Sequence, residues 1–425
     1  MRTEKNNIFI GIDWLLVILY ITLVGFGWMN IYAASVTENS NGLFDFSTRY
    51  GKQLLWIGLS IPLIISILFI NAKFYEKFAS IFYLGSILLL AGLFLVGKNI
   101  NGATSWYNFG GMSLQPSEFA KAFTALAVAK LLSDKQYNLK LIKNQIKAFI
   151  IIFLPAFFIA LQPDLGSVLV YLSFFFVLNR EGLTLNYTLF GSLAIVLFLA
   201  TLLFGPITII IGVFSTLTIL LIFFLKRNKR YLKYNWYKIV GVYAILALFI
   251  FSTSYTYDTL FEQHHRDRFD ILLGISKDTK KIGYNTQQSL QAISSGGFTG
   301  KGYLQGDRTQ GRFVPEQDTD YIFSAVGEEW GFIGSTFVII LFMLLLYRII
   351  YLAETHKNKF GRIYGYGLAS ILFFHLVINI GMVIQLLPTV GIPLPFFSYG
   401  GSSLWGFTVL LFIFIKLDAN KSYDW

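Results

Sequence analysis

The stretch from Trp14 to Ala33, WLLVILYITLVGFGWMNIYA, decides the fold class of this chain. It carries no charged residue, and at ~1.5 Å per helical residue it is long enough to cross the ~30 Å hydrocarbon core of a bilayer. Comparable apolar runs recur along a sequence that is 55% hydrophobic and 13% charged, with a mean hydropathy of +0.61. This composition excludes a soluble globular domain and predicts an all-α fold, a polytopic helical bundle integral to a membrane.

The apolar runs predict about twelve transmembrane helices in a single domain over residues 1–425. A short leader, MRTEKNN, precedes the first run, and no convincing small-residue cleavage site follows it, so we expect an uncleaved first helix. The predicted spans cover residues 14–33, 53–71, 78–97, 117–132, 146–161, 166–180, 186–204, 207–225, 237–253, 321–347, 361–386 and 401–416.

The basic residues set the predicted orientation. A formal charge of +11 could indicate nucleic-acid binding, but the lysines and arginines fall in alternate loops instead of forming one stripe. The positive-inside rule places these loops and both termini in the cytoplasm. The basic groups on that side include Arg2, Lys5, Lys73, Lys77, Lys135, Lys140, Lys143, Arg180, the cluster from Lys226 to Lys233, Lys357, Lys359, Arg362, Lys416 and Lys421. The absence of cysteine excludes disulfides, thiolate metal sites and cysteine nucleophiles.

Four chemically unusual loops emerge on the opposite, outer side in this topology. They cover residues 101–118, 161–166, 254–320 and 388–401. Because ATP and nucleotide sugars are cytoplasmic, chemistry on the outer side needs a substrate that carries its own activation. A sugar joined to a lipid pyrophosphate meets this requirement, since the leaving group travels with the molecule.

The first outer loop leads into a helix with an acid and a base on one face. Pro116 suits the first helical position, and Glu118 and Lys121 are spaced i,i+3. A helix start with a first-turn carboxylate is one interpretation. The other is a site beside Trp106 in which Glu118 orients Lys121. In the second loop, Asp164 is predicted to cap the helix that follows it, with a site role as the alternative.

The segment Ser289–Glu329 concentrates charge in an apolar chain and is the first candidate for a site. Its Gly-Lys-Gly at 300–302 is not a nucleotide phosphate loop, because the spacing is one residue short and Gly302 stands where Ser or Thr is required. The amides there and Lys301 could instead hold a lipid pyrophosphate. The pair His264-His265 is too weak a pattern for a metal site.

Acids close this segment at Asp318, Asp320, Glu328 and Glu329. If a helix starts near Tyr321, at least one of the two glutamates should face the bundle or a wet cavity, because an acid facing lipid costs about 2.5 to 3.5 kcal/mol. Asp320 would sit at the mouth of that cavity, where partial desolvation makes a carboxylate a better base. Helix capping by Asp318 or Asp320 is the alternative.

The chain resembles the SEDS family of shape, elongation, division and sporulation proteins in five ordered strings that run over nearly its whole length. They are GATSWYNFGGMSLQPSEFAK, LQPDLGS, GYNTQQSLQAISSGGFTGKG, VPEQDTDYIFSAVGEEWGFIG and LPTVGIPLPFFSYGGSS. The resemblance implies a peptidoglycan glycosyltransferase that polymerises lipid II on the outer face of the bacterial cytoplasmic membrane. It further implies a class B penicillin-binding protein and elongation-complex membrane proteins as partners, in rod elongation or, alternatively, in division.

The resemblance places the family's essential acid, in its PE-x-x-TD motif, on Asp320, which would deprotonate the acceptor hydroxyl. Positive groups would offset the leaving-group charge, and a divalent cation, Mg²⁺ or Mn²⁺, is a further candidate for this role. No metal ligands are assigned. The residues expected to bind substrate are Trp106, Glu118, Lys121, Asp164, Arg266, Arg268, Lys301, Glu316 and Ser398.

Two departures from the family pattern stand out. Asp318 occupies the position where the family usually has histidine, and residues 186–230 add a hairpin with a basic cytoplasmic loop to the usual ten spans. Residues 254–320 then form the large extracytoplasmic loop. A lipid II flippase and a non-catalytic scaffold are alternative functions. The flippase is less favoured because the sequence shows no pair of broken helices in corresponding halves.

Overall fold

The computed structural model describes residues 11–36, 42–100, 103–110, 112–227, 229–260, 263, 266, 273 and 282–421. These residues belong to two compact units. One unit is formed by the chain up to Leu183 and from Tyr284 onward, and the other by Thr184–Gly283.

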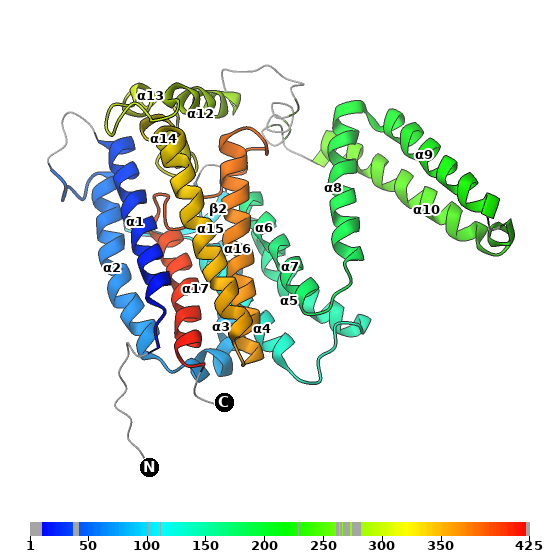
Figure 1. Cartoon of the computed structure of the whole chain (residues 1–425), viewed down its shortest axis with the longest axis horizontal. Helices are drawn as coiled ribbons and strands as arrows, with labels where there is room; N and C mark the ends of the chain where they lie inside the picture. Colours follow the sequence, from blue (N-terminus) through cyan, green and yellow to red (C-terminus); the bar gives the residue numbers. More distant parts are fainter. Residues whose placement is uncertain are drawn as a thin grey trace, which may run out of the picture. The chain divides into compact units, whose positions relative to one another are not determined.

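The first unit is a bundle of long helices that run side by side, with three shorter helices, α12 to α14, at one end (Figure 1). Gly11 lies against Ala419, so the start of α1 and the end of α17 meet at one end. The helices are α1 (Trp14–Ser35), α2 (Arg49–Phe69), α3 (Ala72–Val96), α4 (Pro116–Ser133), α5 (Ile142–Ala160), α6 (Leu165–Val170), α7 (Phe174–Arg180), α12 (Ile282–Gly296), α13 (Asp307–Gln310), α14 (Ile322–Glu329), α15 (Gly331–Thr355), α16 (Lys359–Val383) and α17 (Gly401–Ala419).

Helices α4, α16 and α17 form the centre of this bundle. Helix α16 packs against α4 and α15, and α17 packs against α2 and α4. The apolar windows of α16 and α17 are 67% and 83% buried, the highest values among the candidate spans. A Cβ on Gly406 would lie 3.0 Å from the Glu118 carbonyl oxygen, so a residue without a side chain is needed where α17 crosses α4.

Ten helices in the described part of the chain are long and apolar enough to cross a membrane, which confirms a multi-pass helical membrane protein. The two other predicted spans are helical as well. One is α4, which carries Glu118, Lys121 and Lys130, and the other is the shorter stretch Leu165–Arg180, in which a 3-10 turn at Tyr171–Ser173 separates α6 from α7.

The predicted single span over 321–347 is wrong in one respect, because two helices occupy it. Helix α14 ends at Glu329, and α15 begins at Gly331, whose φ is +63°. A Cβ on Gly331 would lie 2.3 Å from the amide nitrogen of Gly300. The left-handed backbone of this glycine turns the chain, and the 297–302 loop packs into the space that its missing side chain leaves.

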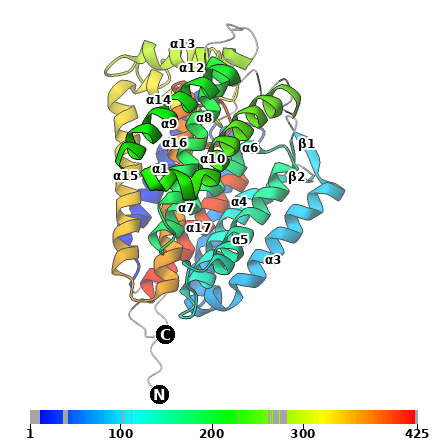
Figure 2. The same ribbon diagram turned by 90° about the vertical axis from the view of Figure 1, so that its right-hand side faces the viewer.

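A small antiparallel sheet occupies part of the loop that was expected between α3 and α4. Strands β1 (Lys98–Ile100), β2 (Ala103–Phe109) and β3 (Met112–Leu114) pair in the order β1-β2-β3. Asn108 pairs with Ser113 and Phe109 with Met112. Figure 2 shows β1 and β2 beside the end of α3, with α4 and α5 next to it. Within the described residues the fold is therefore helical with one short sheet.

The second unit contains α8 (Asn186–Phe204), α9 (Pro206–Arg227) and α10 (Lys229–Tyr255), followed by a π-helical turn at Thr256–Leu260. Gly205, with φ +78°, turns the chain between α8 and α9. Helix α9 packs against α10 through an edge-to-face contact between Phe214 and Tyr243, whose ring centroids are 4.7 Å apart.

Candidate active site at one end of the bundle

Hydrogen bonds join the first-unit parts of the four unusual loops, together with the first turn of α17, at one end of the first unit. The Gln115 amide nitrogen donates to Ser402 Oγ at 3.1 Å, and its side-chain nitrogen donates to Asp164 Oδ2 at 3.0 Å. The Tyr399 amide donates to the Asp318 carbonyl at 2.8 Å. The prediction that these loops share one face is confirmed for their described residues in the first unit, which includes the 254–320 loop only from Tyr284 onward.

Asp320 precedes Tyr321, the N-cap of α14, and a buried amide fixes its main chain. Asn379 Nδ2, from α16, donates to the Asp320 carbonyl at 2.8 Å and to the Ile392 carbonyl at 2.7 Å. A Cβ on Gly391 would lie 3.3 Å from Asp320 Oδ2. The partly exposed carboxylate of Asp320 therefore lies against the 388–401 loop, in space that Gly391 leaves open.

Ser398 ties the same loop to the residue before Asp320. Its hydroxyl donates to the Thr319 carbonyl at 2.6 Å and accepts from the Leu394 amide at 2.8 Å. The residue is only 3% exposed. Both interactions lie inside the protein, so the observed geometry gives Ser398 a positioning role.

The buried carboxylate of Asp318 forms an ion pair with the half-exposed Arg49 at the start of α2. Arg49 Nη1 lies 2.5 Å from Asp318 Oδ1 and 3.7 Å from Glu316 Oε2. The guanidinium carbon also lies 6.0 Å from the centroid of the Tyr399 ring. Burial raises the pKa of Asp318, and the charge of Arg49 offsets only part of this effect.

The alternative interpretation of these acids as helix caps is wrong for α14. Its N-cap is Tyr321, and no side chain makes a capping hydrogen bond at its start. The carboxylate of Asp318 is instead held by Arg49.

A second buried group of polar side chains connects α4 to α16. Lys121 Nζ lies 2.9 Å from both carboxylate oxygens of Glu118 and 3.0 Å from His375 Nε2. His375 Nδ1 lies 3.1 Å from the Pro393 carbonyl. That carbonyl only accepts, so Nδ1 carries the proton and Nε2 accepts from the ammonium. The predicted contact of Glu118 with Lys121 is present, and a role of the two residues in a substrate site stays a prediction.

Lys121 is 1% exposed and lies 4.9 Å from the ring centroid of Phe407. An ammonium has three donors, and Glu118 and His375 supply three acceptor atoms at hydrogen-bond distance. The lysine is therefore fully bonded within the protein. It links α4 to the 388–401 loop through His375.

Lys301 and the Gly-Lys-Gly turn are engaged with α14. Lys301 Nζ lies 2.8 Å from Glu328 Oε1 and 2.9 Å from Asp307 Oδ2. The amides of residues 301 and 302 donate to the carbonyls of Glu328 and Glu329, both at 3.0 Å. The geometry does not support the idea that these two amides hold a pyrophosphate, because they stabilise the loop instead.

Glu328 and Glu329 are both buried, at 0% and 1% exposure, as the cost of acids facing lipid predicted. The Glu328 carboxylate also accepts from the amides of Arg308 and Thr309, at 3.0 and 2.8 Å. These amides belong to the first turn of α13, where a carboxylate is favourable. Glu328 therefore holds α13 and Lys301 against α14.

The structure describes some of the remaining predicted residues in detail, whereas others lie in the second unit or outside the described residues. Asp164 caps α6, since its Oδ1 accepts from the Ser167 amide at 3.0 Å, which confirms the capping prediction. Trp106 lies on β2 opposite Lys98 and is partly buried. Arg266 belongs to the second unit. Arg268, His264 and His265 lie outside the described residues.

Three residues of the site were missed from the sequence: Arg49, His375 and Asn379. A signal for the latter two was present, because they are spaced i,i+4 in the apolar run of α16 and so share one face. Arg49 also carried a signal, since it is a basic residue on the outer side in the predicted topology, against the positive-inside bias.

The sequence left open whether a divalent cation binds near Asp320. Among the described residues, no group of three or more histidines and carboxylates is placed to hold a metal ion. The carboxylates of Glu316 and Asp318 lie instead beside Arg49, and Glu316 also accepts a hydrogen bond from the Thr319 hydroxyl. No step of the chemistry below depends on a cation.

Comparison with known proteins extends these findings. The family model described as cell cycle protein, FtsW/RodA/SpoVE, matches residues 13–234 and 212–423. The chain is 32% identical over 430 residues to the peptidoglycan glycosyltransferase RodA of Treponema pallidum, covering 96% of this chain and 98% of that protein. It is also 32% identical to the peptidoglycan glycosyltransferase MrdB of Escherichia coli K12, and that match covers 88% of this chain and 86% of that protein.

This chain also superimposes on a solved structure, with a TM-score of 0.68. That structure is described as showing the structural coordination of polymerization and crosslinking by a peptidoglycan synthase complex. The identity is 25%, and the match covers 97% of this chain and 99% of that one.

Proposed function

Because this chain belongs to the FtsW/RodA/SpoVE family of cell cycle proteins, we propose that it is a peptidoglycan glycosyltransferase that polymerises lipid II into glycan strands. The relatives named as peptidoglycan glycosyltransferases support this proposal over nearly the full length of the chain. The observation that carries it is Asp320, a partly exposed carboxylate where the polar loops meet at one end of a membrane bundle.

In the proposed reaction, Asp320 is the general base. Its carboxylate takes the proton from the acceptor sugar hydroxyl, whose oxygen attacks the anomeric carbon of the growing chain. The new glycosidic C–O bond forms as the C–O bond to undecaprenyl pyrophosphate breaks, with inversion at that carbon. A general base of this kind contributes about 10² to 10⁴ in rate.

The buried polar groups around Asp320 are proposed to position it. Lys121 holds His375, and His375 holds the Pro393 carbonyl of the 388–401 loop. The same loop is joined to the main chain of Asp320 and its neighbour by Asn379 and Ser398. A base held this way keeps its geometry when substrate binds, which lowers the cost of reaching the transition state.

Partners and location follow from the same family assignment. The similar structure from a peptidoglycan synthase complex supports a class B penicillin-binding protein as the crosslinking partner, in an elongation complex. We place the chain in the bacterial cytoplasmic membrane with both termini in the cytoplasm. The basic residues in alternate loops and the contact of Gly11 with Ala419 support this orientation.

The test is polymerisation of purified lipid II by the detergent-solubilised chain together with its penicillin-binding partner. Glycan strands should form, and their length should increase with time. Transfer of labelled lipid II across vesicles without any polymer would contradict the proposal and favour a transporter.

A further inference from the structure

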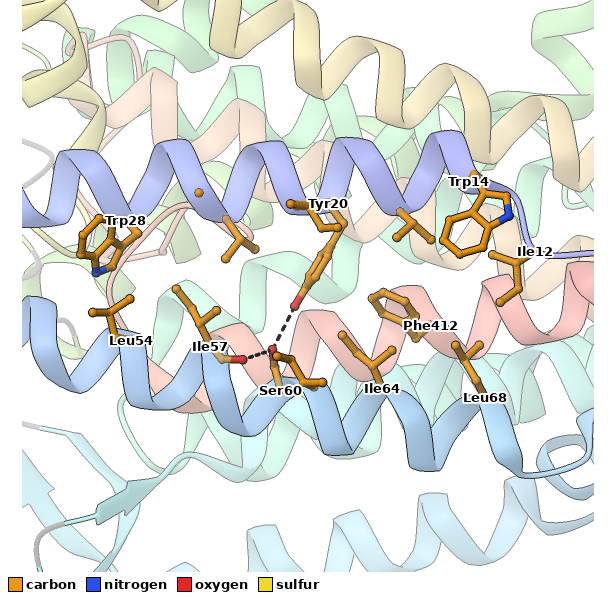
Figure 3. Close-up of a pocket in the computed structure, with 15 residues that line it drawn as sticks. Ile12, Trp14, Tyr20, Trp28, Leu54, Ile57, Ser60, Ile64, Leu68 and Phe412 are labelled. Carbon is orange, nitrogen blue, oxygen red and sulfur yellow. Dashed lines mark hydrogen bonds between the residues drawn. The ribbon is translucent and has the colours of Figure 1, made fainter. Parts of the chain in front are cut away.

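An apolar groove runs between α1 and α2 and encloses a cavity of about 500 Å³. Figure 3 shows Tyr20 and Trp28 from α1, Ile57 and Ile64 from α2, and Phe412 from α17 pointing into the space between the helices. The volume falls within the ~300 to 1,000 Å³ range of ligand pockets. None of its lining residues belongs to the Asp320 loop or takes part in the chemistry proposed above.

The groove opens to the side of the bundle. Ile21 and Ile61, which line it, are 60% and 57% exposed, whereas Tyr20 and Phe412 are 5% and 2% exposed and form its floor. Both α1 and α2 are candidate membrane spans. A ligand could therefore enter laterally from the bilayer without passing through water.

The groove is lined mostly by apolar side chains, and the hydroxyls of Tyr20 and Ser60 in its wall are hydrogen-bonded within the protein. Tyr20 Oη lies 3.0 Å from Thr408 Oγ1 and 3.5 Å from Ser60 Oγ, and Ser60 Oγ donates to the Ile57 carbonyl at 2.6 Å (Figure 3). Because these hydroxyls are already bonded within the protein, the groove favours an apolar chain over a polar headgroup.

The length of the groove distinguishes between kinds of hydrocarbon chain. Its lining residues run from Trp14 to Trp28 on α1 and from Leu54 to Leu68 on α2, each roughly 21 Å of helix at ~1.5 Å per residue. An acyl chain of a bilayer lipid occupies about half of the ~30 Å hydrocarbon core. The groove is longer than one leaflet, so it suits a chain that passes the bilayer midplane.

One end of the groove reaches the candidate active site. Trp28 Nε1 donates to the Tyr50 carbonyl at 3.1 Å. Tyr50 follows Arg49, which is paired with Asp318, two residues before Asp320. A chain lying in the groove would thus leave it beside the loop that carries the proposed base.

From these observations we propose that the α1–α2 groove binds the polyprenyl tail of a lipid-linked sugar. The identity of the tail rests on the proposed function. The groove would bind this part of the substrate along roughly 21 Å of α1 and α2. The tail would be held in the groove while its pyrophosphate end lies at the Asp320 end of the bundle.

The test uses photo-crosslinking of the full chain in lipid nanodiscs. One probe is a polyprenyl diphosphate with a diazirine in its tail, and the other is a phosphatidylglycerol with a diazirine in one acyl chain. The polyprenyl probe should label α1 and α2, and unlabelled undecaprenyl phosphate should compete with it. Preferential labelling of these helices by the phospholipid, without competition, would overturn the proposal.

Two glycine variants sharpen this test. Gly25 lines the groove, and a Cβ there meets nothing within 4 Å, so the ring of Gly25→Phe should occupy groove space. Gly58 on α2 is equally unobstructed but does not line the groove, which makes Gly58→Phe the matched control. Tail labelling should fall at least fivefold in Gly25→Phe and stay unchanged in Gly58→Phe. Equal labelling of both variants would contradict the proposal.

The labelling needs no turnover, so it separates this inference from the proposed function. A chain that is labelled in the groove but makes no polymer would overturn the glycosyltransferase assignment alone. In an active enzyme, Gly25→Phe should raise KM for long-tailed lipid II several-fold and leave KM for a short-tailed analogue unchanged. An equal effect on both substrates would overturn the groove.

Discussion

Replacing Lys121 by methionine should destabilise the protein far more than the loss of one surface charge would. Lys121 is 1% exposed and its ammonium is bonded to Glu118 and His375, so the substitution leaves a buried carboxylate without its counter-charge. Breaking one side of a buried ion pair costs about 3 to 5 kcal/mol. At ~1.4 kcal/mol per factor of ten, this lowers the ratio of folded to unfolded protein by roughly 10² to 10³ or more.

Reversible unfolding in mixed micelles, followed by circular dichroism, would measure this loss. The double variant Glu118→Met with Lys121→Met should recover at least about 2 kcal/mol, because no unpaired carboxylate remains in the protein. Lys130→Met is the control on the same helix, since its ammonium donates to the exposed Lys77 carbonyl, and it should cost about 1 kcal/mol or less. If the Lys121 and Lys130 variants lost equal stability, the account of the buried pair would be refuted.

Three further changes test the surroundings of the site. Asn379→Leu removes donors from two loop carbonyls, so kcat should fall at least tenfold in the polymerisation assay while KM changes little; a change confined to KM would contradict a positioning role. Arg49→Met should raise the pKa of Asp318 further, so the variant should be less stable than wild type at neutral pH. Denaturant titration should show this deficit shrinking as the pH falls toward the ordinary aspartate value of ~3.9, and a deficit independent of pH would rule out the ion pair as its cause. A cysteine replacing Asp307, whose side chain is 84% exposed, should react with an impermeant thiol reagent in intact cells, whereas one replacing exposed Lys357 should be protected; the reverse pattern would invert the topology.

The long helices could be predicted from the sequence because each apolar run carries its own signal. The break at Gly331 could not, since it depends on the 297–302 loop packing where a side chain would otherwise lie. The short sheet had a local signal that was overlooked. Gly110-Gly111 separates β2 from β3, and two glycines between β-forming residues are typical of a hairpin turn.

Only the parts of the site that are close in sequence could be predicted, because the other contacts join residues far apart in the chain. Glu118 and Lys121 are neighbours on one helix, so their pairing follows from spacing. The contact of Lys121 with His375 joins positions 254 residues apart, and Asp318 meets Arg49 across 269 residues. Such pairs depend on how the helices pack. The choice of Asp320 over its neighbouring acids came from the family motif, and the structure added the groups that hold its main chain.

The central claim is that Asp320 is the base, and one comparison tests it most directly. Wild type, Asp320→Asn and Asp307→Asn would be assayed with the penicillin-binding partner under single-turnover conditions on purified lipid II. The account predicts a rate at least 10²-fold lower for Asp320→Asn, with lipid II binding retained, and an unchanged rate for Asp307→Asn. Glycan strands formed at the wild-type rate by Asp320→Asn would contradict it.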